Sequence, residues 1–332
     1  MFIVENYSLA ILLCFVTMVC WGSWANTTKL TSPSWRFELL YWDYGIGILI
    51  TTLIIAFTLG SNGAAGRSFL ADMHQASNSH IYSAILGGIV FNLANILLVA
   101  AIAIAGMSVA FPVGIGIALV LGVIVNYMDH PAGSPMLIFG GVALIVLAIL
   151  LNARAYQKLQ SSASEKISKK GLILSIVSGC LMGLFYKYVA ASMVNNFSMP
   201  EAEKLTPYTA LVFFGIGVVL SSFVFNSIQM KKPFVGSPIL FGSYFKGSLK
   251  DHLVGILGGA IWSIGMSLNI IASGKAGPAV SYGLGQGATV IAAIWGIYVW
   301  KEFDQAPQGT KRLLNFMLLL YIVGLSLLIL SK

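Results

Sequence analysis

Charged residues are scarce in this chain, and their scarcity points to a lipid environment. Only 9% of the 332 residues are Asp, Glu, Lys or Arg, whereas 58% are hydrophobic and the mean hydropathy is +0.87. Soluble domains carry about 25% charged residues, because most of their surface faces water. The composition therefore excludes a soluble globular protein and a disordered chain, and it predicts an integral membrane protein.

Metal ligands and buried acids are also scarce. The three cysteines lie within apolar segments, and the four histidines show no metal-ligand spacing. The carboxylates all lie in loops or near the ends of apolar segments, so no acid–base pair within the membrane is expected. We therefore expect no metal, no cofactor and no enzymatic activity. A membrane-embedded enzyme or a non-transporting receptor is the alternative from a different class.

Long apolar segments, by contrast, are abundant. A membrane-spanning helix needs about 20 mainly apolar residues, and ten segments approach or exceed this length. The expected fold is therefore an all-α membrane protein with ten transmembrane helices. The segments are 7–27, 42–60, 81–105, 107–128, 135–153, 171–194, 208–226, 252–273, 278–299 and 313–330.

Basic residues favour one side of the membrane. Fourteen of the 19 Lys and Arg residues fall in the loops after the odd-numbered segments, and four fall on the other side. Cytoplasmic loops are enriched in Lys and Arg, so both termini are expected outside the cytoplasm, with the chain in the inner (plasma) membrane. A basic cytoplasmic face also accounts for the net charge of +8, and no nucleic-acid partner is expected.

The third and fourth segments recur as the eighth and ninth. Residues 85–127, moved by 171 positions, match the later stretch at 12 of 43 positions without a gap. Glycines dominate the match: Gly88 falls on Gly259, and Gly106 falls on Gly277. Equal glycine spacing is more specific than shared apolar composition. The match therefore predicts an internal duplication.

The duplication divides the chain into two halves of five helices. Residues 1–156 form the first half and residues 171–332 the second, joined by a basic cytoplasmic linker over 157–170. Since five is odd, the two halves must enter the membrane in opposite orientations. Such inverted-topology repeats are typical of secondary transporters, which hold substrate near the midplane between the repeats. A duplication kept only for folding is the alternative.

Neutral polar side chains within the segments are the first candidates for substrate binding. A neutral amide costs less in hydrocarbon than a charge does, but it needs a hydrogen-bond partner. Such residues would suit a polar, uncharged solute, although hydrogen bonding between helices is the alternative role. The candidates are Asn92, Asn95, Ser263, Tyr282 and Gln286.

Aromatic residues and one lysine complete the predicted substrate site. Trp21 and Trp24 flank a Gly-Ser pair, and Trp262 lies about ten residues into its segment, too deep for an interfacial belt. Lys187 is the only charge embedded in an apolar run. It is expected either to face the cavity or to extend its ammonium to the membrane surface. Asp43 and Glu5 are the candidates for proton coupling.

Four stretches resemble plant ureide permeases of the drug/metabolite transporter superfamily. They are Met1-Phe2-Ile3-Val4-Glu5, Trp21-Gly22-Ser23-Trp24, Tyr41-Trp42-Asp43-Tyr44 and residues 87–127. The resemblance implies a fold of two inverted five-helix repeats and proton-linked import of allantoin, uracil and related oxo-heterocycles. Plant members have a longer central loop with a nucleotide-binding-like motif, which the linker 157–170 lacks. Bacterial glucose and rhamnose permeases share this architecture.

The sequence thus predicts a secondary active transporter that works by alternating access. The expected activity is proton-coupled import of a small neutral polar metabolite, first a ureide or nucleobase such as allantoin or uracil. A monosaccharide permease of the glucose or rhamnose type is the second expectation, and a drug or metabolite exporter is the third. A monomer and a homodimer are both compatible with the sequence.

Overall fold

The computed structural model describes residues 1–159 and 168–332. Within these residues, ten helical segments are long and apolar enough to cross a membrane, so the predicted all-α membrane fold is confirmed. Residues 160–167 of the predicted linker lie outside the described residues. Eight of the spans are single helices: α2 (Phe37–Phe57), α4 (Asn78–Ala105), α5 (Met107–Asp129), α6 (Pro135–Leu159), α7 (Lys169–Ser192), α8 (Pro207–Lys231), α9 (Leu249–Ala276) and α12 (Thr310–Ile329).

The first and ninth spans change helix type along their length. Helix α1 (Tyr7–Ser23) continues as the 3₁₀ helix η1 (Trp24–Leu30). The ninth span consists of α10 (Pro278–Gly285), α11 (Ala288–Ile294) and the π-helical turn η3 (Trp295–Val299). Departures from α-helical geometry within a span often mark functional positions. Two short helices, α3 (Phe69–Gln75) and η2 (Phe241–Lys246), lie in connecting segments.

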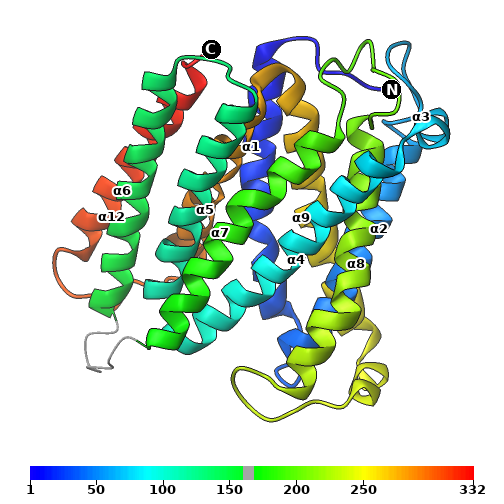
Figure 1. Ribbon diagram of the computed structural model, residues 1–332. Helices are drawn as coiled ribbons and strands as arrows, with labels where there is room; N and C mark the ends of the chain where they lie inside the picture. Colours follow the sequence, from blue (N-terminus) through cyan, green and yellow to red (C-terminus); the bar gives the residue numbers. More distant parts are fainter. Residues whose placement is uncertain (160–167) are drawn as a thin grey trace.

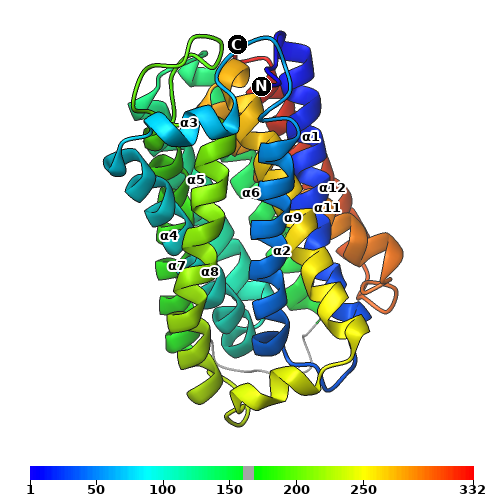
Figure 2. The ribbon, with the colours of Figure 1, turned by 90° about the vertical axis from the view of Figure 1, so that its right-hand side faces the viewer.

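The spans lie side by side, and both termini are at one end of the bundle (Figure 1). Helix α1 begins at this end, whereas α7 begins at the opposite end. We call these the terminal face and the linker face. Figure 2 shows α2, α4, α7 and α8 running between the same two faces. If the chain consists of two five-helix halves of opposite orientation, then their first helices, α1 and α7, must begin at opposite ends of the bundle, as they do here.

Helices α4 and α9, the third spans of the two halves, have matching ends. Each is 28 residues long, and each is followed by a glycine with positive φ, Gly106 at 77° and Gly277 at 84°. These φ values lie in a region that L side chains rarely adopt. Each glycine therefore permits a sharp turn directly into the next helix of its half.

The two halves also contact each other through matching positions. Gly88 on α4 faces the carbonyl of Phe214 on α8, so closely that a Cβ would collide with the backbone. Gly259 on α9 faces the carbonyl of Tyr44 on α2 in the same way. The third helix of each half therefore packs against the second helix of the other half. Close backbone approach at small residues is the usual basis of helix packing in membranes.

Several helices extend beyond the predicted apolar segments at the linker face. Helix α2 begins at Phe37 instead of residue 42, and α9 begins at Leu249 instead of residue 252. Glu38 lies in the first turn of α2 and pairs with Arg36, and the Ser248 side chain caps α9 by accepting from the Asp251 amide. Hydropathy alone does not include these turns in the segments, because their residues are polar. The same polar residues stabilise the helix ends.

Candidate functional site

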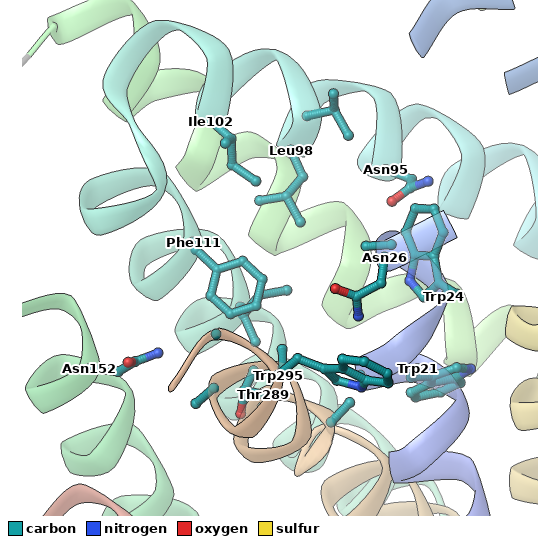
Figure 3. A pocket seen from close by; sticks show the side chains of 18 of the residues that line it. Trp21, Trp24, Asn26, Asn95, Leu98, Ile102, Phe111, Asn152, Thr289 and Trp295 are labelled. Carbon is teal, nitrogen blue, oxygen red and sulfur yellow. The ribbon is translucent and has the colours of Figure 1, made fainter. Parts of the chain in front are cut away.

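A cavity of about 450 Å³ lies between the two halves and reaches the linker face. Its walls come from α1, η1, α2, α4, α5, α6, α7, α9 and the ninth span. Exposed residues of the cavity wall, among them Thr28, Lys29 and Trp300, mark its mouth. Figure 3 shows part of the wall, with Asn152 on one side and Asn26, Asn95 and Trp24 on the other.

Aromatic rings close the inner side of the cavity. Trp21 and Trp262 stack with 5.9 Å between ring centroids, and Trp21 Nε1 donates a 3.1 Å hydrogen bond to the Trp262 carbonyl. Trp262 also packs against Phe91 at 4.2 Å and against the fully buried Phe214 at 5.8 Å. A solute entering from the linker face therefore meets flat apolar surfaces that block the path to the terminal face.

The polar groups of the inner wall are neutral amides and a hydroxyl. Nearer the mouth, Asn26 donates to the Ser23 carbonyl and accepts from Trp300 Nε1 at 2.6 Å. Asn95 donates to the Tyr41 hydroxyl at 3.1 Å. The Thr289 hydroxyl is 2.6 Å from that of Tyr321. The inner wall therefore suits an uncharged polar solute better than an ion.

At the mouth, the end of α1 and η1 are joined to η3 and the residues just after it, through every third residue from Ser23 to Lys29. A 3₁₀ helix has three residues per turn, so residues spaced by three share one face. The three pairs are Ser23 with Trp295 at 2.8 Å, Asn26 with Trp300 at 2.6 Å, and Lys29 with Glu302 at 3.4 Å. Tyr156 of α6 donates to Glu302 at 2.8 Å, which links a third element to the mouth.

The cavity contains five of the nine predicted substrate-binding residues. They are Trp21, Trp24, Asn95, Trp262 and Gln286. Asn92, Ser263 and Tyr282 are instead buried between helices and bonded within the protein. Asn92 accepts from the Tyr41 hydroxyl and donates to Ser221 Oγ, both at 2.8 Å. Ser263 and Tyr282 donate to backbone carbonyls. For these three residues the structure favours the alternative role, hydrogen bonding between helices.

Lys187 lies outside the cavity, close to the terminal face. Its ammonium is 3.2 Å from the Asp129 carboxylate, and its side chain is 43% exposed. The long side chain starts near the end of α7, so it can carry the charge out of the apolar region. This placement corrects the expectation of a cavity position and agrees with the alternative, extension to the membrane surface.

Replacing Lys187 with methionine is therefore expected to leave transport unchanged. An exposed ion pair contributes only about 0–1 kcal/mol, and methionine preserves the apolar stem. The measurement is initial uptake rate in proteoliposomes, normalised to inserted protein, with Asp129→Asn as the matched variant from the other side of the pair. A severalfold fall in uptake for Lys187→Met with normal insertion would contradict this placement.

Neither predicted proton-coupling residue lines the cavity. Glu5 is exposed and precedes α1 at the terminal face. Asp43 is buried on α2, where it accepts a 2.5 Å hydrogen bond from the Tyr244 hydroxyl and lies 2.9 Å from His252 Nδ1. Burial and the bond to Asp43 raise the pKa of Tyr244, which lies in η2 outside the spans. Asp43 thus belongs to a polar cluster that joins α2, η2 and α9.

Sequence reasoning missed several residues of the cavity wall. They include Asn26, Phe111, Asn152, Thr289, Trp295, Trp300 and Glu302. The sequence did offer a reason to consider Asn152, because it is the only Asn or Gln in the fifth predicted segment, 135–153. Asn26 and Trp300 lie at segment ends, where polar and aromatic residues are common without a binding role.

Ten spans around a central cavity are typical of a polytopic membrane transporter. The sequence profile of the family described as "Sugar transport protein" matches residues 12–330. The chain therefore belongs to this family of transporters, which are not enzymes.

The individual relatives are named for two kinds of solute. Ureide permease 1 of Arabidopsis thaliana is 25% identical over all of this chain and 99% of its own length, and Ureide permease 4 of the same plant is 22% identical over the same shares. The "Probable glucose uptake protein GlcU" of Staphylococcus aureus is 26% identical over 63% of this chain and 64% of its own length. A solved crystal structure with 14% identity covers 97% of this chain with a TM-score of 0.58, which supports the fold alone.

Proposed function

We propose that the protein is a secondary active transporter that imports a small neutral polar metabolite, with a ureide or nucleobase such as allantoin or uracil as its substrate. The observation that carries this proposal is the composition of the cavity, where neutral amides and stacked aromatic rings surround about 450 Å³. Flat heterocycles with both hydrogen-bond donors and acceptors fit such walls. Full-length similarity to ureide permeases supports the same substrate class.

Alternating access between two inverted halves is the proposed mechanism. Matching contacts at Gly88 and Gly259 support it, because each half packs on the other through equivalent helices. If the halves exchange conformations, the cavity that now reaches the linker face would reach the terminal face instead. We further propose that the linker face is cytoplasmic, since most Lys and Arg residues fall in its loops. The described state would then be open to the cytoplasm.

Proton coupling is part of the proposal, and Asp43 is its candidate acid. Asp43 is a buried carboxylate held by two titratable partners, Tyr244 and His252, from two other elements. A group that binds and releases a proton in step with a conformational change needs partners that change with it. Asp43 meets this need because it lies on α2 and its partner His252 lies on α9, and these helices belong to different halves of the chain.

Uptake into proteoliposomes tests the substrate and the coupling together. Labelled allantoin and labelled uracil are supplied with and without an inward proton gradient, and empty liposomes serve as the control. We expect accumulation of at least one of these solutes above equilibrium only when the gradient is present. Uptake that equilibrates without accumulating would overturn proton coupling, and an absence of uptake would overturn the ureide assignment.

A monosaccharide is the second candidate substrate. The family description and the similarity to a glucose uptake protein favour it, and aromatic rings such as Trp21 also stack on the apolar faces of sugars. Labelled glucose and rhamnose in the same vesicles separate the two classes. Uptake of a sugar without uptake of a ureide would retain the transporter and change its substrate. A drug or metabolite exporter would instead carry solute in the opposite direction.

A further inference from the structure

Tyr282 lies on the terminal-face side of the cavity, where the two halves of the chain are in contact. It is fully buried on α10, one helical turn before the cavity residue Gln286. Its hydroxyl donates to the carbonyls of Ala118 on α5 and Met182 on α7, at 3.2 and 3.0 Å. Its ring covers Gly122 so closely that a Cβ there would collide with the ring. Tyr282 therefore holds the terminal face closed.

The internal repeat places Phe111 at the position equivalent to Tyr282. A displacement of 171 residues joins the two, and each is the fifth residue of its helix, α5 or α10. The fourth and ninth spans cross in opposite directions, so Phe111 lies about one helical turn from the linker face and Tyr282 about one turn from the terminal face. Phe111 is half-buried and lines the open cavity.

The groups that hold Tyr282 on α5 have equivalents on α11. The same displacement places Ala118 on Thr289 and Gly122 on Ala293. Thr289 and Ala293 both line the cavity, and Figure 3 shows Thr289 there together with Phe111. The surface that would receive the Phe111 ring is therefore exposed to the open cavity.

Helix α1 is the equivalent of α7, the third element around Tyr282. A displacement of 161 residues places Gly22 on Gly183 and Trp21 on Met182. The two glycines make matching contacts, because a Cβ at Gly183 would press against α5 and a Cβ at Gly22 would collide with α11. Trp21 also lines the cavity. Each group that holds Tyr282 thus has an equivalent in the cavity wall.

We propose that Phe111 is the side chain that closes the linker face of the cavity. When the halves exchange conformations, its ring enters the space between α11 and α1 and packs on Ala293, as Tyr282 now packs on Gly122 between α5 and α7. The solute is then separated from the linker face while Tyr282 leaves its own site. This inference rests on the proposed alternating access and names the residue that performs one of its two closures.

The two closures differ in their chemistry. Tyr282 carries a hydroxyl and faces a glycine, whereas Phe111 has no hydroxyl and Ala293 carries a Cβ. The smaller ring therefore has the larger partner, which keeps the packed volume similar. The hydrogen bonds of Tyr282 have no counterpart at Phe111, so closure of the terminal face is favoured. This difference favours the described state, in which the cavity reaches the linker face.

Distances between spin labels at the two faces measure which face is closed without requiring a known substrate. The protein is studied in lipid nanodiscs, after its three cysteines are replaced with alanine and its thermal midpoint is checked against the wild type. We expect two distances for each label pair, with populations that change in opposite directions at the two faces. The pairs, all at exposed positions, are Ala103→Cys with Tyr298→Cys near the linker face and Met128→Cys with Lys275→Cys near the terminal face.

Tyr282→Phe is expected to shift the populations toward closure of the linker face. It removes only the hydroxyl, and the ratio of linker-closed to linker-open protein should rise at least about threefold. Adding Phe111→Ala to this variant should lower the ratio at least about fivefold, because the ring that fills the closed site is lost. Tyr41→Phe is the matched control, since its hydroxyl bonds to Asn92 and Asn95 within the first half.

A double substitution tests the contact through a gain instead of a loss. Phe111→Tyr with Ala293→Gly recreates at the linker face the Tyr–Gly pair of the terminal face. We expect the linker-closed ratio to rise at least about threefold over the wild type, whereas Ala293→Gly alone should not raise it. Loss of folded protein cannot produce this gain.

The outcomes distinguish this inference from the proposed function. If the linker face closes but Phe111→Ala leaves the ratio unchanged or raises it, Phe111 is not the closing side chain, and alternating access is retained. A single unchanging distance at each face in every variant overturns both. If the expected shifts occur in a protein that takes up neither allantoin nor uracil, then the proposed substrate is wrong and the role of Phe111 is retained.

Discussion

Replacing Gly88 or Gly259 with alanine is expected to destabilise the protein strongly for so small a change. A Cβ at either position would collide with a carbonyl of the facing helix, that of Phe214 or that of Tyr44. Backbone atoms cannot rotate aside as a side chain can, so the two helices must separate. Overpacking of this kind costs about 1–3 kcal/mol. We expect a clear fall in the midpoint of thermal unfolding for each variant.

Gly116→Ala makes the same chemical change where there is room. A Cβ at Gly116, on α5, has no atom within 4 Å, and alanine favours a helix over glycine by about 1 kcal/mol. This control is expected to keep the wild-type midpoint or raise it slightly. Equal midpoints for the three variants, measured in the same detergent, would show that the close helix contacts do not limit stability.

Replacing Asp43 with asparagine is expected to abolish proton-driven accumulation but to preserve exchange. Asparagine can still accept a hydrogen bond from Tyr244 and remain beside His252, but it cannot bind and release a proton. We expect the gradient-dependent part of uptake to fall at least about tenfold, while counterflow, which needs no net proton movement, continues. Both are measured in the same batch of proteoliposomes.

Asp129→Asn is the matched control for this experiment. Asp129 pairs with Lys187 in an exposed position, so it should not affect coupling. Accumulation by Asp43→Asn at the wild-type level would exclude Asp43 as the coupling acid. If Asp43→Asn loses accumulation and counterflow together, then the cluster with Tyr244 and His252 supports the conformational cycle or the fold, and the proton is carried elsewhere.

Much of the fold could be predicted from the sequence because its main determinant is local. A stretch long and apolar enough to cross a membrane can be recognised without knowing its neighbours, and all ten predicted spans are present. Helix ends were predicted less well. Arg36, Glu38 and Ser248 extend or cap helices through polar contacts that hydropathy does not register.

The site could be predicted only in part. Trp262 was recognised as a candidate because an aromatic residue so deep in a span is unusual, and Trp21 because it flanks a Gly-Ser pair together with Trp24. Asn92 and Asn95 looked equivalent, since three residues place them about 60° apart around a helix. Only Asn95 lines the cavity, whereas Asn92 bonds to Ser221 on α8. That difference depends on where α8 packs, which no local pattern encodes.

The sequence by itself determined the lipid environment, the number of crossings, the helical class and the recurrence of residues 85–127 at 256–298. These follow from composition and from periodic positions along one chain, because the hydrophobic effect acts on each segment separately. Tertiary structure decided which polar groups meet. It gave Asn92 and Lys187 partners within the protein, and it joined Asn26 to Trp300 at the mouth of the cavity. Such pairings depend on the rotation and spacing of whole helices, which are set only when distant segments pack together.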